Sequence, residues 1–313
     1  MSSEPLAKLA EEFFQASLDS SPTSAIMRGH KKYFDQIEEL TDEKFEEEME
    51  NVQNFKNLLS NIDLNSLSDK EKVTYGMLEF ALDSNYDSLV DRGWEFSAGV
   101  AGFEGFLIDY NQQMFIPDKE SGDMLLKRLE LYEKFYSQIS DVQKRGLLND
   151  RVATQRNLKR SIDQLESYLQ TSLESDPLLL ANFAPTIDKN EVSEWKEKAK
   201  KVIEKYVRPN VMTYLEQLKV EHLPKGRTDE NPGIMWIEGG EDVYLRSLRK
   251  YTGHKETTVK EVHEIGLSEI ERLKEEFFEI GKDVFDGVNS PEEVLSKMQT
   301  EPSMRYESKE QMI

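Results

Sequence analysis

The sequence predicts an all-α protein of antiparallel helices with at most short strands. Apolar residues recur every three or four positions along most of the chain, which is the spacing of one buried helix face. Capping-box sequences, in which Ser or Thr precedes Glu by three residues, stand before several of these stretches. Hydrophobic residues make up 37% and charged residues 32% of the 313 positions, so the chain folds.

The N-terminal part contains three such helical faces. The first runs through residues 6–18 and the second through residues 45–59, each with apolar side chains three or four positions apart. The third runs through residues 75–89 and is opened by a capping box of Ser68 and Glu71. We expect all three helices to bury these faces in one core.

A segment rich in glycine and aromatic residues follows at residues 93–110. So many rings would expose a large apolar surface in a solvated loop, so we expect the segment to be buried. An irregular plug between helices is one interpretation, and the wall of a pocket is the other. The residues concerned are Gly93, Gly99, Gly102, Gly105, Trp94, Phe96, Phe103, Phe106 and Tyr110.

Helical patterning returns in the middle of the chain. The apolar faces at residues 125–142 and 158–173 predict an antiparallel pair of helices. A further helix is predicted to be capped by Asn190, kinked at Pro209 and ended by Pro224. The absence of a fixed repeat argues against a solenoid.

The C-terminal part begins with an irregular stretch, residues 225–240, in which residues 234–237 could form a short strand. Three helices follow: one over about residues 241–251, one opened by Thr258 with Glu261, and a short one opened by Ser290. We therefore expect a helical region over residues 1–224 and a second helical region over residues 225–313.

The last residues predict that the architecture continues. Ser308 and Gln311 have the spacing of a capping box, yet only two residues follow. A helix of one turn is marginal in water. We therefore expect a chain truncated at its C-terminus.

Charge and composition exclude several classes of function. The 61 Asp and Glu against 40 Lys and Arg give a net charge of −21, which opposes binding to nucleic acid and to anionic membranes. The chain has no cysteine, so it forms no disulfide and no thiolate metal site. No signal peptide or long apolar run is evident, and a cytoplasmic location is expected.

The four histidines suggest no metal site. His263 and Glu264 look like half of the HExxH zinc motif, but position 267 is Leu, which cannot bind a metal. His30, His222 and His254 are scattered without ligand spacing. No phosphate-binding Gly-rich loop is present either.

The most site-like cluster comprises Gly239, Gly240, Tyr244 and Tyr251. A glycine pair before a helix can leave backbone N–H groups free for a ligand carboxylate. The alternative is a plain helix start with core tyrosines.

Residues 239–273 resemble a signature segment of the domain-of-unknown-function family eight-eight-five. The stretches that begin at Ser21, at Asp118 and at His222 also resemble this family and occur in its order. Val243 departs from the pattern, since relatives often carry a second aromatic residue there. The resemblance covers essentially the whole chain.

The resemblance implies a mostly helical, gluzincin-like metallopeptidase fold whose zinc-binding helix lies in a C-terminal half that is missing here. It implies that this chain is a non-catalytic N-terminal portion without its own cofactor, which forms a scaffold and one wall of a peptide-binding cleft. Expected partners are a peptide substrate in the full-length protein, the C-terminal half, or a second copy. The alternative is a stand-alone helical interaction module.

Overall fold

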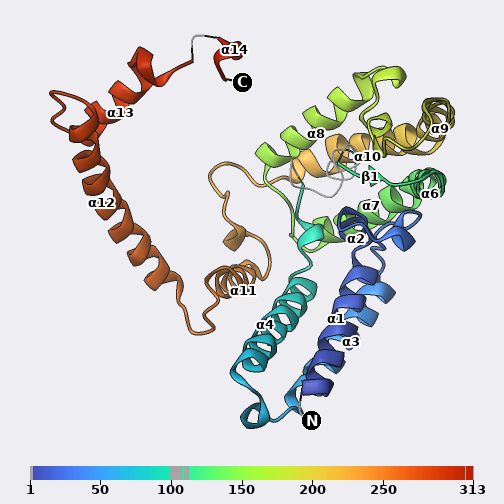
Figure 1. Cartoon of the computed structure of the whole chain (residues 1–313), viewed down its shortest axis with the longest axis horizontal. Coiled ribbons are helices and arrows are strands. Elements are labelled where there is room, and N and C mark those ends of the chain that lie inside the picture. Colours follow the sequence, from blue (N-terminus) through green and yellow to red (C-terminus); the bar gives the residue numbers. More distant parts are fainter. Residues whose placement is uncertain (1–2, 99–107, 109–112, 307, 313) are drawn as a thin grey trace. The chain divides into compact units, whose positions relative to one another are not determined.

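The computed structural model describes residues 3–98, 108, 113–306 and 308–312. The chain forms two compact units, Met1–Tyr244 and Leu245–Ile313. Within the described residues it is helical with two very short strands (Figure 1), which confirms the predicted all-α class. The regional division expected between residues 224 and 225 stays a prediction.

The first unit begins with a group of packed helices. These are α1 (Ser3–Ser20), α2 (Pro22–Met27), α3 (Asp42–Ser60) and α4 (Asp69–Asp91). Helices α1, α3 and α4 lie side by side (Figure 1), and α3 and α4 form a hairpin. The Ser68 hydroxyl and the Glu71 carboxylate cap α4 as predicted, and Thr41 caps α3.

A second group of helices completes the unit. It consists of α6 (Lys119–Glu130), α7 (Tyr132–Leu148), α8 (Gln155–Gln170), α9 (Lys189–Val202) and α10 (Arg208–Gln217). Helix α10 packs against both α7 and α8, while α6 packs against α9. Leu131 separates α6 from α7, so the apolar face that the sequence shows as continuous belongs to two helices. The core side chains of both groups form one continuous cluster.

Short elements connect these helices. The strands β1 (Phe115–Ile116) and β2 (Asn182–Phe183) pair in parallel, with Phe115 opposite Asn182. Three-residue 3₁₀ turns occur at Lys31–Tyr33, Leu64–Ser66, Gly93–Glu95, Leu173–Ser175, Pro177–Leu179, Leu223–Lys225, Ile234–Trp236 and Pro302–Met304.

Two local predictions are wrong. Helix α9 is capped by Asp188, whose carboxylate accepts from the Asn190 N–H, so Asn190 lies one residue inside the helix. The expected strand at residues 234–237 is a 3₁₀ turn, closed by hydrogen bonds from Trp236 N to Gly233 O and from Ile237 N to Ile234 O. A local turn is favoured there because no described strand lies alongside to form backbone hydrogen bonds with these residues.

π-Helical turns flank α10, at Ile203–Val207 before it and at Leu218–His222 after it. The first ends two residues before Pro209, the residue at which we expected a kink, and Pro209 itself lies in the first turn of α10, where its missing N–H is tolerated. The second brings the His222 imidazole into the interior, where it is 4% exposed.

Most of the Gly and aromatic insert, residues 99–107, 109 and 110, lies outside the described residues. In its described part, the Trp94 ring stacks on Phe45 with ring centroids 4.9 Å apart and an interplanar angle of 8°. Ala98 and Ile108 are buried. The described part of the insert therefore packs on the core of the first unit, and Trp94 also lines a cavity between α1, α3 and α4, so both interpretations of the insert hold in part.

The second unit has a much smaller core. Helix α11 (Gly240–Thr252) spans the division between the units, and α12 (Val259–Val284), α13 (Pro291–Thr300) and α14 (Lys309–Met312) follow. Thr258 and Glu261 form the predicted capping box of α12, and Ser290 caps α13. The buried apolar side chains of the core where α12 meets α13 are Phe285, Val288 and Val294.

We predict that Gly281→Ala destabilises the packing of α13 on α12 by about 1–3 kcal/mol. A Cβ at Gly281 would collide with the side chain of Val294, whose β-branched χ1 is stiff. Gly266→Ala is the matched control, because a Cβ there meets no atom within 4 Å and Ala favours the helix by up to about 1 kcal/mol. Hydrogen–deuterium exchange of the α13 amides measures the effect, and equal protection in both variants would contradict it.

We also predict that the free energy of unfolding decreases as the pH falls below about 6.5, the ordinary pKa of His. Burial lowers the pKa of the His222 imidazole, although its contact with Gln217 O opposes this. The unfolded chain therefore takes up a proton that the folded chain does not, so stability is lost as the pH falls. Urea titrations of the parent and of His222→Gln between pH 5 and 7.5 should show a smaller pH slope in the variant.

Candidate functional site

A densely connected polar group of the first unit forms where α4 ends. Arg92 takes a left-handed conformation with φ of +45°, and the 3₁₀ turn Gly93–Glu95 follows it. A residue with a Cβ is strained in this conformation, so the reversal needs support from the surrounding structure. The turn brings the Glu95 carboxylate into the interior, where the residue is 4% exposed.

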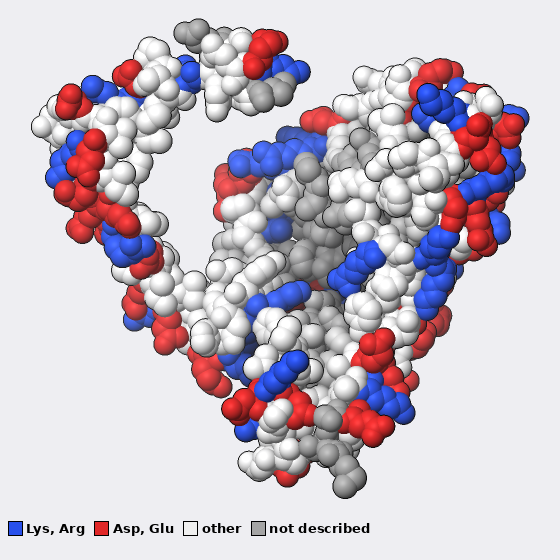
Figure 2. All heavy atoms as spheres, in the orientation of Figure 1, with Lys and Arg blue, Asp and Glu red and all other residues white. Residues whose placement is uncertain are grey.

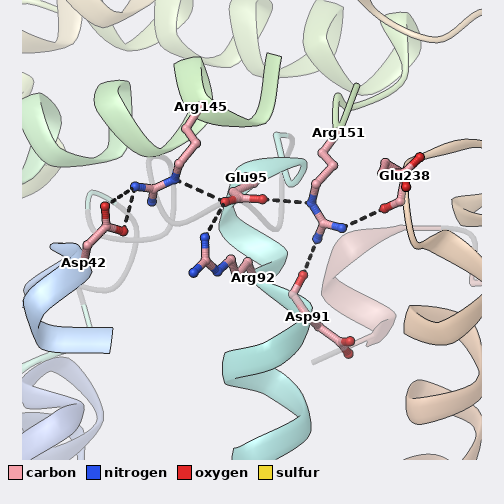
Figure 3. Close-up of polar contacts among 7 residues, drawn as sticks. All are labelled: Asp42, Asp91, Arg92, Glu95, Arg145, Arg151 and Glu238. Atoms are coloured by element: carbon pink, nitrogen blue, oxygen red, sulfur yellow. Dashed lines mark hydrogen bonds and ion pairs between the residues drawn. The ribbon is translucent and has the colours of Figure 1, made fainter. Parts of the chain in front are cut away.

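Three guanidinium groups surround this carboxylate (Figure 3). Arg151 Nε donates to Glu95 Oε2 at 2.8 Å, and Arg145 Nε donates to Glu95 Oε1 at 3.2 Å. Arg92 Nη1 lies 3.6 Å from Oε1. A buried carboxylate is tolerated when it is paired and hydrogen-bonded in this way. We call Glu95 with Arg92, Arg145 and Arg151 the Glu95 cluster.

Arg145 extends the Glu95 cluster to α3. It lies near the end of α7, and its Nη1 is 2.6 and 2.7 Å from the two carboxylate oxygens of Asp42, in the first turn of α3. Gly146 allows α7 to approach this closely, since a Cβ there would collide with Glu95 O. The Glu95 cluster therefore joins α3, α4 and α7.

Arg151 extends the Glu95 cluster to the segment that carries the predicted site. Its Nη1 donates to Glu238 O at 2.8 Å and its Nη2 donates to Asp91 O (Figure 3). The guanidinium also lies over the Phe96 ring, 5.0 Å from the centroid. Glu238 directly precedes Gly239, so a single side chain fixes the backbone at the glycine pair.

The two glycines have a packing role. Gly239 has φ of +69°, a conformation that favours glycine, and a Cβ at Gly240 would collide with Ile234 O. The Gly240 N–H donates to Ile237 O at 3.0 Å. The expectation that the Gly240 N–H is free for a ligand is therefore wrong, because the 3₁₀ turn before α11 supplies its acceptor.

The two predicted tyrosines are exposed. Tyr244 is 45% and Tyr251 is 87% exposed, so the interpretation of them as core tyrosines is wrong. Val243, the position that departs from the family pattern, is 4% exposed and takes the core-facing place at the start of α11. Tyr251 belongs to the second unit, whereas Gly239, Gly240 and Tyr244 belong to the first.

Two large side chains that precede Tyr244 in the sequence are also exposed, and the sequence pattern marked them only as part of a possible strand. Met235 is 58% and Trp236 is 54% exposed. Arg227 orders the backbone just before them, because it donates to Val152 O at 2.8 Å, to Pro232 O at 3.1 Å and to Gly233 O. We call Met235, Trp236 and Tyr244 the 235–244 surface. Both of its flanks are held by arginine side chains.

The first unit also contains a cavity of about 380 Å³ between α1, α3 and α4. Phe13, Phe55 and Val52 contribute its apolar wall, and Glu48 lines it as well. Burial raises the pKa of the Glu48 carboxyl, and the Ser20 hydroxyl opposes this. The helical spacing identified the apolar residues as core, but it gave no sign that they border a hollow.

The described residues show no group of three or more His, Cys, Asp or Glu side chains that could hold a metal ion. His263 is exposed on α12, and His222 is buried after α10. In the same part of the chain, no helix combines the length and the apolar character needed to cross a membrane.

We predict that Glu95→Gln destabilises the first unit by about 1.5–3 kcal/mol, because the buried position loses its charge-assisted hydrogen bonds from Arg145 and Arg151 and gains an amide N–H₂ that no guanidinium can accept from. Asp229→Asn is the matched control. Asp229 pairs with Arg156 at 2.9 Å, but both side chains are more than 60% exposed, so the change should cost less than about 1 kcal/mol. Urea unfolding followed by circular dichroism gives both values, and similar losses would contradict the role of the Glu95 cluster.

Comparison with known proteins identifies relatives. No curated protein matches the chain. A solved structure described as "the putative lipoprotein from Colwellia psychrerythraea" superposes with a TM-score of 0.79 at 18% identity, over 98% of this chain and 56% of that one. The chain thus spans just over half the length of this neighbour and shares its fold.

The family comparison agrees with the resemblance seen in the sequence. The family described as "Bacterial protein of unknown function (DUF885)" matches residues 22–313, which includes both compact units. The match covers nearly all of the chain, so the chain belongs to the DUF885 family.

Proposed function

We propose that this chain is the scaffold portion of a DUF885 protein and that the 235–244 surface forms part of one wall of a peptide-binding cleft. The observation that carries the proposal is the exposure of Met235, Trp236 and Tyr244 on a backbone held by Arg151 and Arg227. Exposed aromatic and Met side chains on a rigid backbone bind partners at a small entropic cost.

The charge around this surface favours a basic peptide. Glu238, Glu241 and Asp242 are exposed beside Trp236 and Tyr244 in the sequence. Carboxylates at the rim of an apolar surface attract cationic side chains and disfavour acidic ones. We therefore expect peptides with Lys or Arg next to apolar residues.

In this proposal the zinc ion and the catalytic residues come from polypeptide outside this chain, in a gluzincin-like arrangement, and the chain alone is not catalytic. The support is the family resemblance, together with a solved neighbour of which this chain covers only 56%. Tyr251, 87% exposed, is proposed as a further substrate contact. The cytoplasmic location remains a prediction from the sequence, and cell fractionation would test it.

A stand-alone helical interaction module is the second candidate. The observation that favours it is the row of exposed apolar residues on α12, described below. The two candidates differ in the residues that matter, since the first depends on Trp236 and Tyr244 and the second on α12.

We predict that fluorescein-labelled octapeptides of Lys, Leu and Ala bind the chain, and that Trp236→Ala and Tyr244→Ala each weaken binding at least about tenfold. Met77→Ala is the control, because Met77 is 69% exposed on α4, away from this surface in the sequence. Fluorescence anisotropy measures the affinities. No binding up to about 1 mM peptide would refute the proposed surface.

A peptidase assay with and without added zinc tests the non-catalytic role. The expected result is no hydrolysis in either condition. Hydrolysis that a chelator abolishes and zinc restores would show that this chain assembles a catalytic centre by itself.

A further inference from the structure

Helix α12 carries a regular heptad pattern. Apolar or small residues recur at alternating spacings of four and three over its 26 residues, with one His in the series. Such a pattern, sustained over more than three heptads, is the sequence signature of a coiled coil. The d positions are Val259, Gly266, Leu273 and Ile280, and the a positions are His263, Ile270, Phe277 and Val284.

The described structure leaves this row exposed. The large apolar side chains of the row are 43–57% exposed, except that of Phe277, which is half-buried against the core with α13. Large apolar side chains exposed in a continuous row mark an interaction surface. We call the eight residues at the a and d positions the α12 seam. Five of them are 43–57% exposed, namely Val259, Ile270, Leu273, Ile280 and Val284.

Most of the other positions of α12 are charged or polar, with Val262, Ile265, Leu267 and Phe278 as the apolar exceptions. Figure 2 shows acidic and basic side chains together along one side of the helix. Arg272 pairs with Glu269 and Glu276 at 2.8 Å, and Lys282 pairs with Glu279 at 2.7 Å. These pairs lie along one edge of the α12 seam and on the side of the helix away from it.

The positions beside the seam indicate which partner fits. The e positions carry Lys260 and Lys274, whereas the g positions carry Glu269, Glu276 and Asp283. In a parallel pair of identical helices, a g residue faces the e residue five positions further along the partner, so Glu269 faces Lys274 of the second copy. Within α12 these two side chains pair with Arg272 and Glu271, and in the dimer each would contact the second copy as well. An antiparallel pair would place acidic g positions opposite each other.

Helix α12 carries eight acidic and four basic residues, a net charge of 4 − 8 = −4. This charge disfavours an anionic lipid surface, which attracts amphipathic helices rich in Lys and Arg. Beside α12, the core formed with α13 has three buried apolar side chains. Burial of the seam would therefore add substantially to the apolar contacts of the second unit.

We propose that the α12 seam binds the α12 seam of a second copy of this chain, as a parallel and in-register two-stranded coiled coil. The proposal goes beyond the proposed scaffold function and does not depend on it, since the peptide surface and the α12 seam share no residue. Two copies would bury the five exposed seam residues of each helix and form two Glu269 to Lys274 ion pairs.

Sedimentation equilibrium on the full chain tests the association. A monomer–dimer equilibrium is expected, and Leu273→Glu should weaken it on the order of 100-fold, because both copies place a charge in the apolar seam. Ile265→Glu is the control, since Ile265 is 59% exposed but lies at a c position, away from the seam. A chain that remains monomeric at about 100 µM overturns the proposal, and so does a dimer that Leu273→Glu leaves unchanged.

Disulfide cross-linking tests the orientation, because the chain has no cysteine of its own. Val259→Cys and Ile280→Cys, made as separate variants, should each form a cross-linked dimer in a parallel, in-register pair. An antiparallel pair can bring at most one of these positions next to its own copy. Cross-linking of only one variant, or of neither, overturns the parallel register.

A charge exchange tests the ion pairs. Glu269→Lys should weaken the dimer, because it places Lys opposite Lys274 of the second copy. The double variant Glu269→Lys with Lys274→Glu should restore it. A double variant no tighter than Glu269→Lys overturns the assigned pairing.

Discussion

The pairing of the Glu95 carboxylate with three arginines is the interaction on which the rest of the first unit depends. It connects the end of α4, the end of α7 and the start of α3. Through Arg151 it also reaches the backbone at Glu238, 143 residues further along the chain than Glu95. Desolvated charge is costly unless each group finds its partners, so the arrangement of these elements is strongly specified.

Two other buried ion pairs, Arg128 with Glu38 and Arg208 with Asp176, stabilise connecting segments in the same way. The fully buried Arg128 guanidinium donates to Thr23 Oγ1 and Gln36 O, and Glu38 accepts from both Thr23 N and Thr23 Oγ1. Asp176 accepts from Arg208 at 2.8 Å and from Leu178 N at 3.1 Å. In each case a charged side chain satisfies backbone groups where no helix or strand does so. The long connections of the first unit are therefore ordered by charge as well as by apolar contact.

The two units differ in the size of the apolar core that they bury. In the first unit the helical faces meet in one continuous core, and exposed apolar side chains remain both on α4, at Val73 and Met77, and on the 235–244 surface, whose backbone arginines hold. In the second unit α12 leaves most of its seam exposed. The first unit therefore provides a fixed surface, whereas the second provides a helix that another helix can cover.

The sequence by itself determined the all-α class, the helical faces and the capping boxes of α4 and α12, because these features depend on residues within one turn of each other. It also showed the resemblance to the family that the whole-chain comparison confirms. The tertiary structure alone decided the burial of Glu95 among arginines and the contact of Arg151 with the backbone at Glu238. Each of these depends on groups from segments that are distant in the sequence. Charge pairing between distant residues follows no sequence period, so the sequence does not show which of the 61 acidic residues is buried or which arginines pair with it. Helical spacing can therefore be read from the chain, but the partners of its buried charges emerge only when the helices pack.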